Sequence, residues 1–266
     1  MRRPTRLLAV SLPAALATVP VALAGADSAS GGAERAASAT AIQAVPAQRA
    51  AESVAAAALA EATRPSPALI ARVVPGMSIA LRARPNGPLA LRVGDTTEFG
   101  SSQRLGVVRQ AGRWLGVTTP SLPNGKLGWI DRRSASIRIE RTDWRIVADV
   151  SSRTVTLSRA GERVRRLAVA VGRPGSPTPT GRFAVTDKLA GGSYGPYYGC
   201  CILALSATQP NTPPGWTGGN RMAIHGTSDP SSIGAASSAG CLRASDDDLS
   251  FLMRRLPVGT PVVIRR

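Results

Sequence analysis

The 266-residue sequence has few histidine, cysteine and aromatic residues. It contains one histidine and three cysteines without Cys-x-x-Cys spacing, which is a poor ligand set for tetrahedral zinc. Phe, Trp and Tyr make up 4% of the chain, and no basic patch is interleaved with aromatic residues, as a nucleic-acid-binding surface would be. We therefore predict no metal, no cofactor and no nucleic-acid partner.

Long apolar runs are also scarce, and the sequence contains none that could span a bilayer after residue 26. The earlier run LLAVSLPAALATVPVALAGA follows the cationic MRRPTR and ends in small residues, which is typical of an export signal. Pro13 and Pro20 make this run a poor permanent transmembrane helix. We predict that residues 1–26 are a signal peptide, with an uncleaved membrane anchor as the alternative. The predicted location is the extracellular space, the cell wall or the periplasm.

Acidic residues are half as frequent as basic ones. The chain has 16 Asp and Glu against 33 Lys and Arg, a formal net charge of +17, and its lysines are Lys126 and Lys188. This excess favours residence near a polyanion. For an exported protein the sequence predicts an anionic cell-wall polymer as that partner.

The three cysteines allow more than one arrangement. An odd number leaves at least one thiol unpaired, or paired between molecules. Cys241 either forms a disulfide with Cys200 or Cys201, or is a free, reactive thiol. The adjacent pair itself is either a vicinal disulfide or two buried thiols. Composition does not choose between these possibilities.

Changes in composition divide the chain into four parts. Residues 27–68 are Ala-rich with almost no large apolar residues, and we predict a disordered linker. Residues 69–141 contain five short β-type runs with Pro-Asn-Gly turn signals, which predicts a small β-barrel or sandwich. The end of this part, LGWIDRR, resembles bacterial SH3-like wall-associated domains. Trp114 and Trp129 are expected in its core, rather than as ligand platforms.

Residues 142–266 form a second β-rich unit, for which we predict a β-sandwich or barrel with one short helix. Strand candidates include WRIVADV, RTVTLSR, CILALS, RMAIH and TPVVIRR. Ser245 to Asp248 reads as a capping box, and the apolar residues that follow recur at helical spacing before Pro257. The whole chain is therefore predicted to be mainly β.

The single histidine and Cys241 lie in the segment HGTSDPSSIGAASSAGCLR, sixteen residues apart. A cysteine nucleophile needs a base, donors for an oxyanion and open backbone around it. His225 ends an apolar strand and can supply the base, Gly240 leaves the backbone beside Cys241 open, and Arg243 is placed to bind a carboxylate or carbonyl. These residues together predict a cysteine nucleophile with a base and oxyanion donors close to it.

The motifs H-G-T and S-x-G-C-L-R, preceded by T-P-T-G-R-F, resemble those of the L,D-transpeptidase family, also called the YkuD domain. The resemblance covers residues 142–266. It implies that Cys241 is the nucleophile, that His225 activates it, and that the Gly226 carbonyl orients the imidazole. It also implies that Ser238, Gly240, Arg243 and Thr227 belong to the substrate or oxyanion site. Many members have histidine where this chain has Ala239, so a role of that second histidine is absent here.

The resemblance implies an exported enzyme that forms 3→3 cross-links between peptidoglycan stem peptides. The cysteine attacks the amide after the third residue of a tetrapeptide, D-alanine leaves, and a side-chain amine accepts the acyl group. Carbapenem-type β-lactams are implied as further ligands, and we expect a monomer. The alternatives are an L,D-carboxypeptidase, attachment of a protein to the wall, and a non-catalytic wall-binding module. The tyrosines in GGSYGPYYG form either a lid or an ordinary packed loop.

Overall fold

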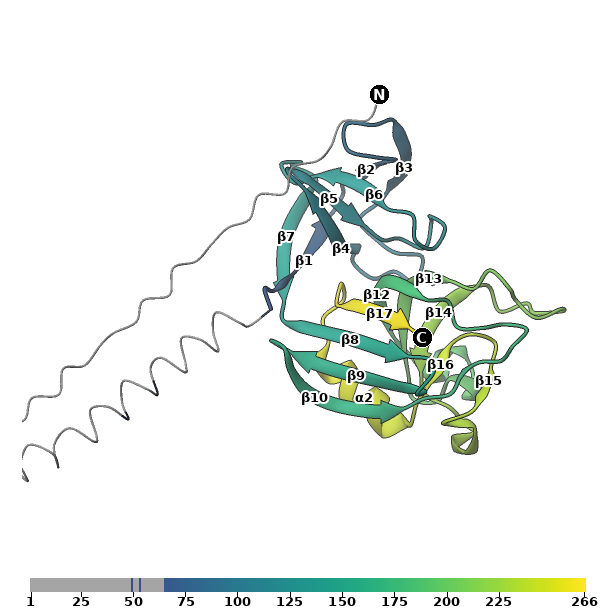
Figure 1. Ribbon diagram of the computed structural model, residues 1–266. Coiled ribbons are helices and arrows are strands. Elements are labelled where there is room, and N and C mark those ends of the chain that lie inside the picture. The colour runs from purple at the N-terminus through teal and green to yellow at the C-terminus, as the bar shows by residue number, and fades with distance from the viewer. Residues whose placement is uncertain (1–48, 50–52, 54–64) are drawn as a thin grey trace, which may run out of the picture. The chain divides into compact units, whose positions relative to one another are not determined.

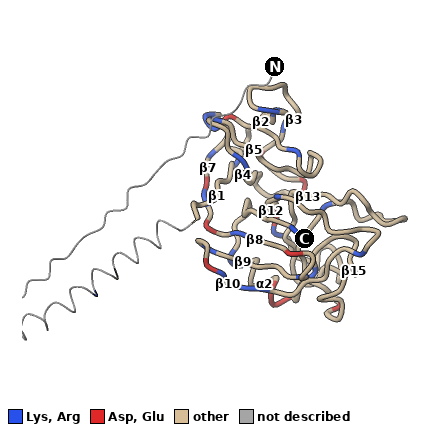
Figure 2. Tube along the Cα trace, viewed as in Figure 1, with Lys and Arg blue, Asp and Glu red and all other residues tan. Residues whose placement is uncertain are grey.

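The computed structural model describes residues 65–266, together with Arg49 and Ser53. The predicted signal peptide and most of the predicted linker lie outside the described residues. The described chain is mainly β, as predicted, and forms two large sheets (Figure 1). Basic residues lie on strands of both sheets (Figure 2). In the part of the chain that is described, no helix has both the length and the apolar character needed to span a membrane.

The first sheet has seven strands in the order β3-β2-β6-β5-β4-β1-β7. They are β1 (Ala68–Val73), β2 (Ile79–Arg82), β3 (Leu89–Val93), β4 (Arg104–Ala111), β5 (Trp114–Val117), β6 (Gly128–Asp131) and β7 (Ile137–Thr142). The five predicted strands correspond to β2 to β6, while β1 and β7 were not predicted. Glu140 on β7 pairs with Arg72 on β1 and Arg104 on β4, with N–O distances of 2.9 Å each. The charged Glu140 of IRIERT thus lies on a strand, where cross-strand ion pairs accommodate it.

The core of the first sheet consists of alternating apolar residues such as Leu81, Leu115 and Ile130, which are fully buried. Trp114 is 7% exposed and Trp129 is 8% exposed. Both tryptophans are therefore core residues, as predicted, and neither offers an open aromatic surface to a ligand.

The second sheet has eight strands in the order β10-β9-β8-β17-β12-β13-β14-β16. They are β8 (Trp144–Asp149), β9 (Thr154–Arg159), β10 (Glu162–Ala168), β12 (Gly181–Ala190), β13 (Cys201–Thr208), β14 (Arg221–His225), β16 (Leu242–Arg243) and β17 (Pro261–Arg265). Two further strands, β11 (Val171–Gly172) and β15 (Ala236–Ser238), pair with each other. Three 3₁₀ turns are η1 (Gly191–Tyr194), η2 (Pro196–Tyr198) and η3 (Pro230–Ser232).

One α-helix, α2 (Asp246–Arg255), is present within residues 65–266. It begins where the capping box predicted, because the Ser245 hydroxyl accepts a hydrogen bond from the Asp248 amide at 3.2 Å. Leu249 and Leu252 are fully buried in the main core. The helix covers β13, a central strand whose residues from Ile202 to Ala207 are all buried. Burial on both faces explains why this strand lacks alternation.

Hydrogen bonds join the connection between β5 and β6 to the second sheet. The Ser206 hydroxyl on β13 donates to Thr118 Oγ1 at 2.9 Å in a buried position. The Asn124 side chain donates to the Thr208 carbonyl at 2.6 Å and accepts from the Thr208 amide at 3.0 Å. At Gly106 on β4 an added Cβ would lie 2.4 Å from the Cβ of Ala184, so glycine permits this close approach. Residues 118–124 are thus hydrogen-bonded to β13, and β4 packs closely against β12.

Candidate active site

Parallel pairing of β14 with β16 brings the two predicted catalytic residues together. In this ladder Ile224 is paired with Leu242 and His225 with Arg243. Cys241 immediately precedes β16 and lies two residues from Arg243, the partner of His225. Because side chains two residues apart on a strand share one face of the sheet, Cys241 lies on the same face as His225. Cys241 and His225 both line one cavity of about 200 Å³. His225 and Cys241, sixteen residues apart in sequence, therefore lie in the wall of the same cavity.

His225 is fully buried and held in one orientation. Its Nδ1 lies 2.6 Å from the Gly226 carbonyl oxygen, which can only accept, so Nδ1 carries the proton and Nε2 has the free lone pair. Nε2 has no hydrogen-bond partner among the residues that the structure describes. Burial lowers the pKa of His225 to about 4; the Gly226 hydrogen bond opposes this shift, and the Arg243 cation adds to it. The imidazole is therefore neutral near pH 7 and can accept a proton.

Cys241 is a free, half-buried thiol. Its Sγ lies 4.0 Å from the Arg221 carbonyl oxygen. Burial raises the pKa of the Cys241 thiol above its usual 9.0, while the Ala223 backbone and the Arg243 cation act in the opposite direction. The resting thiol is therefore protonated near pH 7, beside a neutral imidazole. This pair is suited to proton transfer during attack rather than to a preformed ion pair.

The cavity combines the catalytic pair with an aromatic wall. Its lining includes Tyr197 and Tyr198, whose ring centroids lie 5.7 and 5.0 Å from that of His225. Tyr194 and Trp216, 46% and 39% exposed, lie at the same cavity. Ala239 also lines it. The aromatic residues of GGSYGPYYG thus cover the imidazole.

The loop before Cys241 is fixed by internal hydrogen bonds. The Ser238 hydroxyl donates to the Cys241 carbonyl at 2.6 Å and accepts from the Gly240 amide at 3.0 Å. Gly240 has φ +122°, and an added Cβ would lie 2.1 Å from Gln209 Nε2. The position therefore requires glycine for both conformation and space. Ser238 and Gly240 shape the nucleophile loop without lining the cavity.

Two supporting residues were not predicted as site residues. Thr178 Oγ1 accepts from the Gly172 amide at 2.8 Å and donates to the Gly240 carbonyl at 2.7 Å. Gln209 Nε2 donates to the Pro177 and Ala239 carbonyls at 3.0 Å each. Thr178 belongs to T-P-T-G-R-F, a segment that was named above as part of the family resemblance. Both side chains tie the nucleophile loop to distant parts of the chain.

Arg243 and Thr227 occupy different surroundings. Arg243 donates to the Tyr197 hydroxyl, and its guanidinium carbon lies 4.7 Å from the Tyr197 ring centroid. Its buried Nε has no partner among the described residues. The Thr227 hydroxyl instead closes a turn with the amide and carbonyl of Asp229 and is not part of the cavity lining. Of these two predicted residues, only Arg243 is connected to the aromatic wall.

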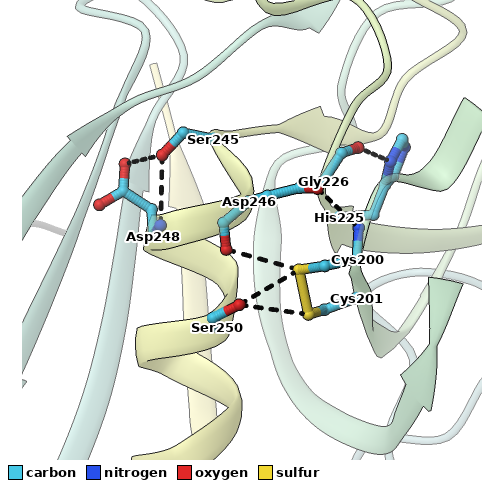
Figure 3. Close-up of a disulfide and its surroundings, with 8 residues drawn as sticks. All are labelled: Cys200, Cys201, His225, Gly226, Ser245, Asp246, Asp248 and Ser250. Carbon is cyan, nitrogen blue, oxygen red and sulfur yellow. Dashed lines mark hydrogen bonds between the residues drawn. A yellow bond between two sulfur atoms is a disulfide. The ribbon is translucent and has the colours of Figure 1, made fainter.

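The adjacent cysteines form a vicinal disulfide near His225 and Gly226 (Figure 3). The Cys200 amide donates to Asp246 Oδ2 at 3.0 Å, and Ser250 Oγ contacts both sulfurs. The Cys201 carbonyl accepts from the Gly226 amide at 3.0 Å, next to the carbonyl that orients His225. Cys241 is therefore outside the disulfide. In the described part of the chain, no group of three His, Cys, Asp or Glu residues is arranged to hold a metal ion.

Comparison with known proteins identifies the domain that contains these residues. Residues 143–264 match the family model of the YkuD L,D-transpeptidase catalytic domain. These residues belong to the L,D-transpeptidase catalytic-domain family. YkuD of Bacillus subtilis (strain 168), whose name describes it as an L,D-transpeptidase, is 33% identical to this chain over 125 residues. The matched residues are 46% of this chain and 66% of YkuD. YqjB of the same organism, named likewise, is 35% identical over 105 residues, 36% of this chain and 56% of YqjB. The match thus spans about two thirds or less of these relatives.

Solved structures resemble the chain more distantly. An L,D-transpeptidase from Mycobacterium smegmatis covers 76% of this chain and 100% of its own, with 17% identity and a TM-score of 0.41. L,D-transpeptidase 3 from Mycobacterium tuberculosis, in complex with a faropenem-derived adduct, covers 60% of this chain and 97% of its own, with 17% identity and a TM-score of 0.37.

Proposed function

We propose that this protein is an exported peptidoglycan L,D-transpeptidase that works through a Cys241 thioester. The observation that carries the proposal is the pairing of a free Cys241 thiol with a neutral His225 in one cavity, inside the matched catalytic domain. His225 Nε2 has no partner in the described chain and is available to take the thiol proton.

In the first half-reaction, Cys241 Sγ attacks the carbonyl carbon of the amide after the third stem residue. The thiol proton passes to His225 Nε2, and the Gly226 carbonyl stabilises the resulting imidazolium through Nδ1–H. The Gly240 amide is occupied by Ser238, so the Cys241 amide is the proposed donor to the oxyanion. The carbon–nitrogen bond then breaks, Nε2–H protonates the leaving amine, and D-alanine departs from the thioester.

In the second half-reaction, the side-chain amine of another stem attacks the thioester. His225 takes a proton from that amine, the carbon–sulfur bond breaks, and the thiol is restored. The product is a 3→3 cross-link. Carbapenem-type β-lactams are expected to acylate the same sulfur, because their strained amide presents the same electrophilic carbon.

We propose export as part of the same assignment, because peptidoglycan lies outside the membrane. The proposal rests here on the cationic N-terminus, the apolar run that follows it, and the net charge of +17. Such a charge would concentrate the protein near an anionic wall. We propose that the protein acts as a monomer there.

Intact-mass spectrometry of the full-length chain with a disaccharide tetrapeptide tests the proposal. Wild type should gain the mass of the substrate less D-alanine, and Cys241→Ala should gain none. The double variant Cys200→Ser/Cys201→Ser, which retains only Cys241, is the control and should still form the adduct. Released products identify the acceptor: a cross-linked dimer for an amine, a tripeptide for water.

No adduct and no product from folded protein with a free Cys241 would overturn the proposal. That result would favour the wall-binding module instead.

A further inference from the structure

One residue from a connection between two strands of the first sheet reaches the cavity. Phe99, in the segment between β3 and β4, lines the cavity together with Cys241 and His225. Among the described lining residues, Phe99 is the one that precedes Thr142. The cavity wall is therefore completed by a part of the chain outside the matched catalytic domain.

The segment that carries Phe99 is closed on itself. The Thr97 hydroxyl accepts from the amides of Phe99 at 3.3 Å and Ser101 at 3.1 Å. The Thr97 amide donates to the Ser101 carbonyl at 2.8 Å. These hydrogen bonds fix the backbone on both sides of Phe99, so the position from which its side chain extends is also fixed.

Three consecutive residues of this segment contact the catalytic domain. Thr97 Oγ1 donates to Asp187 Oδ1 on β12, and Asp187 is fully buried. Glu98 Oε1 accepts from Arg221 Nη2 at 2.8 Å. The Arg221 guanidinium carbon lies 5.5 Å from the Phe99 ring centroid. Because Arg221 is also the residue whose carbonyl lies 4.0 Å from Cys241 Sγ, Phe99 stacks on the residue beside the nucleophile.

On its other side Phe99 begins a series of edge-to-face aromatic contacts. Its centroid lies 6.2 Å from that of Tyr194, and Tyr194 lies 6.5 Å from Tyr198. Tyr198 in turn lies 5.0 Å from His225. Such contacts prefer defined ring orientations. Phe99 thus supports Tyr194 and Tyr198 from outside while facing the cavity itself.

We propose that Phe99 is a specificity-determining residue of this transpeptidase. Its ring forms the wall against which a small apolar side chain of the donor stem peptide packs while the reacting carbonyl lies at Cys241. The connection between β3 and β4 is then part of the substrate site. The inference rests on the proposed function, because it assigns the donor chain of that reaction.

The test compares Phe99→Ala, Phe99→Leu and Phe251→Ala with wild type in the full-length chain. Phe251 is a matched control: it is also half-buried and stacked on arginines, with Arg165 and Arg255 at 4.5 and 3.7 Å, but it lies on α2 and does not line the cavity. The kinetic constants kcat and KM are measured with a disaccharide tetrapeptide. Thermal unfolding of each variant is measured in parallel.

We expect Phe99→Ala to raise KM by about tenfold with a much smaller change in kcat, as for a lost apolar contact in a pocket. Phe99→Leu should recover most of this loss, because leucine restores an apolar wall. Phe251→Ala should leave KM unchanged even if it lowers the unfolding temperature. An unchanged KM in folded Phe99→Ala, or an equal rise in Phe251→Ala, would overturn the inference.

A second readout does not require turnover. Phe99→Ala should speed labelling of Cys241 by a large maleimide, relative to iodoacetamide, because a wall of the cavity is removed. If wild type labels normally but never turns over the tetrapeptide, the proposed function fails, and this labelling ratio decides the role of Phe99. An unchanged ratio would then reject Phe99 as a cavity wall.

Discussion

His225 and Gly226, adjacent in sequence, form the hydrogen bond that sets the chemistry of the site. The Nδ1–H of His225 donates to the Gly226 carbonyl at 2.6 Å. That bond fixes the tautomer and leaves the lone pair on Nε2. The Gly226 amide is bonded to Cys201, and an added Cβ at Gly226 would lie 2.1 Å from Asp246 Oδ1. Gly226 is therefore held from two sides and can be replaced by no larger residue without a shift.

The buried imidazole should make folding stability depend on pH. The pKa of His225 is lowered from 6.5 to about 4, so the unfolded chain binds a proton more readily than the folded one between these values. The stability that neutral His225 allows is present above pH 6.5 and is lost as pH falls through 4. We expect wild type to lose up to about 3 kcal/mol more than His225→Gln on this descent.

Urea unfolding of both proteins at pH 7.5, 5.5 and 4.5 measures the difference. Parallel pH profiles for wild type and His225→Gln would show that His225 titrates normally in the folded state.

Reactivity of Cys241 should report a neutral pair at rest. Since burial raises the pKa of the Cys241 thiol above 9.0, the thiolate fraction grows about tenfold per pH unit below that value. Alkylation by iodoacetamide, followed by mass spectrometry from pH 5 to 10, should rise steadily with that slope. A flat rate from pH 5 to 8 would instead indicate a preformed thiolate–imidazolium pair.

Acylation and alkylation of His225→Gln together distinguish base catalysis by His225 from simple exposure of the Cys241 thiol. His225→Gln should slow acylation by the tetrapeptide by about 10²–10⁴-fold, the usual contribution of a general base. Alkylation of this variant at pH 9 should change little, because hydroxide then removes the proton. Equal losses in both assays would mean that His225 acts by holding the structure rather than by taking the proton.

Local sequence signals predicted part of this arrangement. The capping box at Ser245 located α2, and the apolar run RMAIH located the strand that ends at His225. Strand β16, which begins at Leu242, was not predicted. Contacts between distant segments left no such signal. Glu140 on β7 is paired with arginines of β1 and β4, and Phe99 has no local pattern that links it to Cys241. Periodicity reports one face of one element, so it does not show which element lies opposite.

Thr178 offers a test of how tightly the nucleophile loop must be held. Thr178→Val keeps the shape but removes bonds to the Gly172 amide and the Gly240 carbonyl. Leaving these buried groups unpaired should lower the free energy of unfolding by about 1–3 kcal/mol. Acylation should slow as well, because Gly240 precedes the nucleophile.

Thr180→Val, an exposed position in the same segment, is the matched control and should change stability by less than about 0.5 kcal/mol. Equal effects of the two substitutions on stability and acylation would argue against a role for the Thr178 bonds.

The disulfide arrangement predicts a simple thiol count. With Cys200 bonded to Cys201 and Cys241 free, unfolded wild type without reductant should give one reactive thiol, and three after reduction. Cys241→Ala should give none before reduction and two after it. The distinction matters for the reaction, because only a thiol at Cys241 can attack an amide. Three thiols without reductant would show that Cys200 and Cys201 are not bonded to each other. No thiol in wild type would show that Cys241 is itself in a disulfide, which blocks acyl transfer.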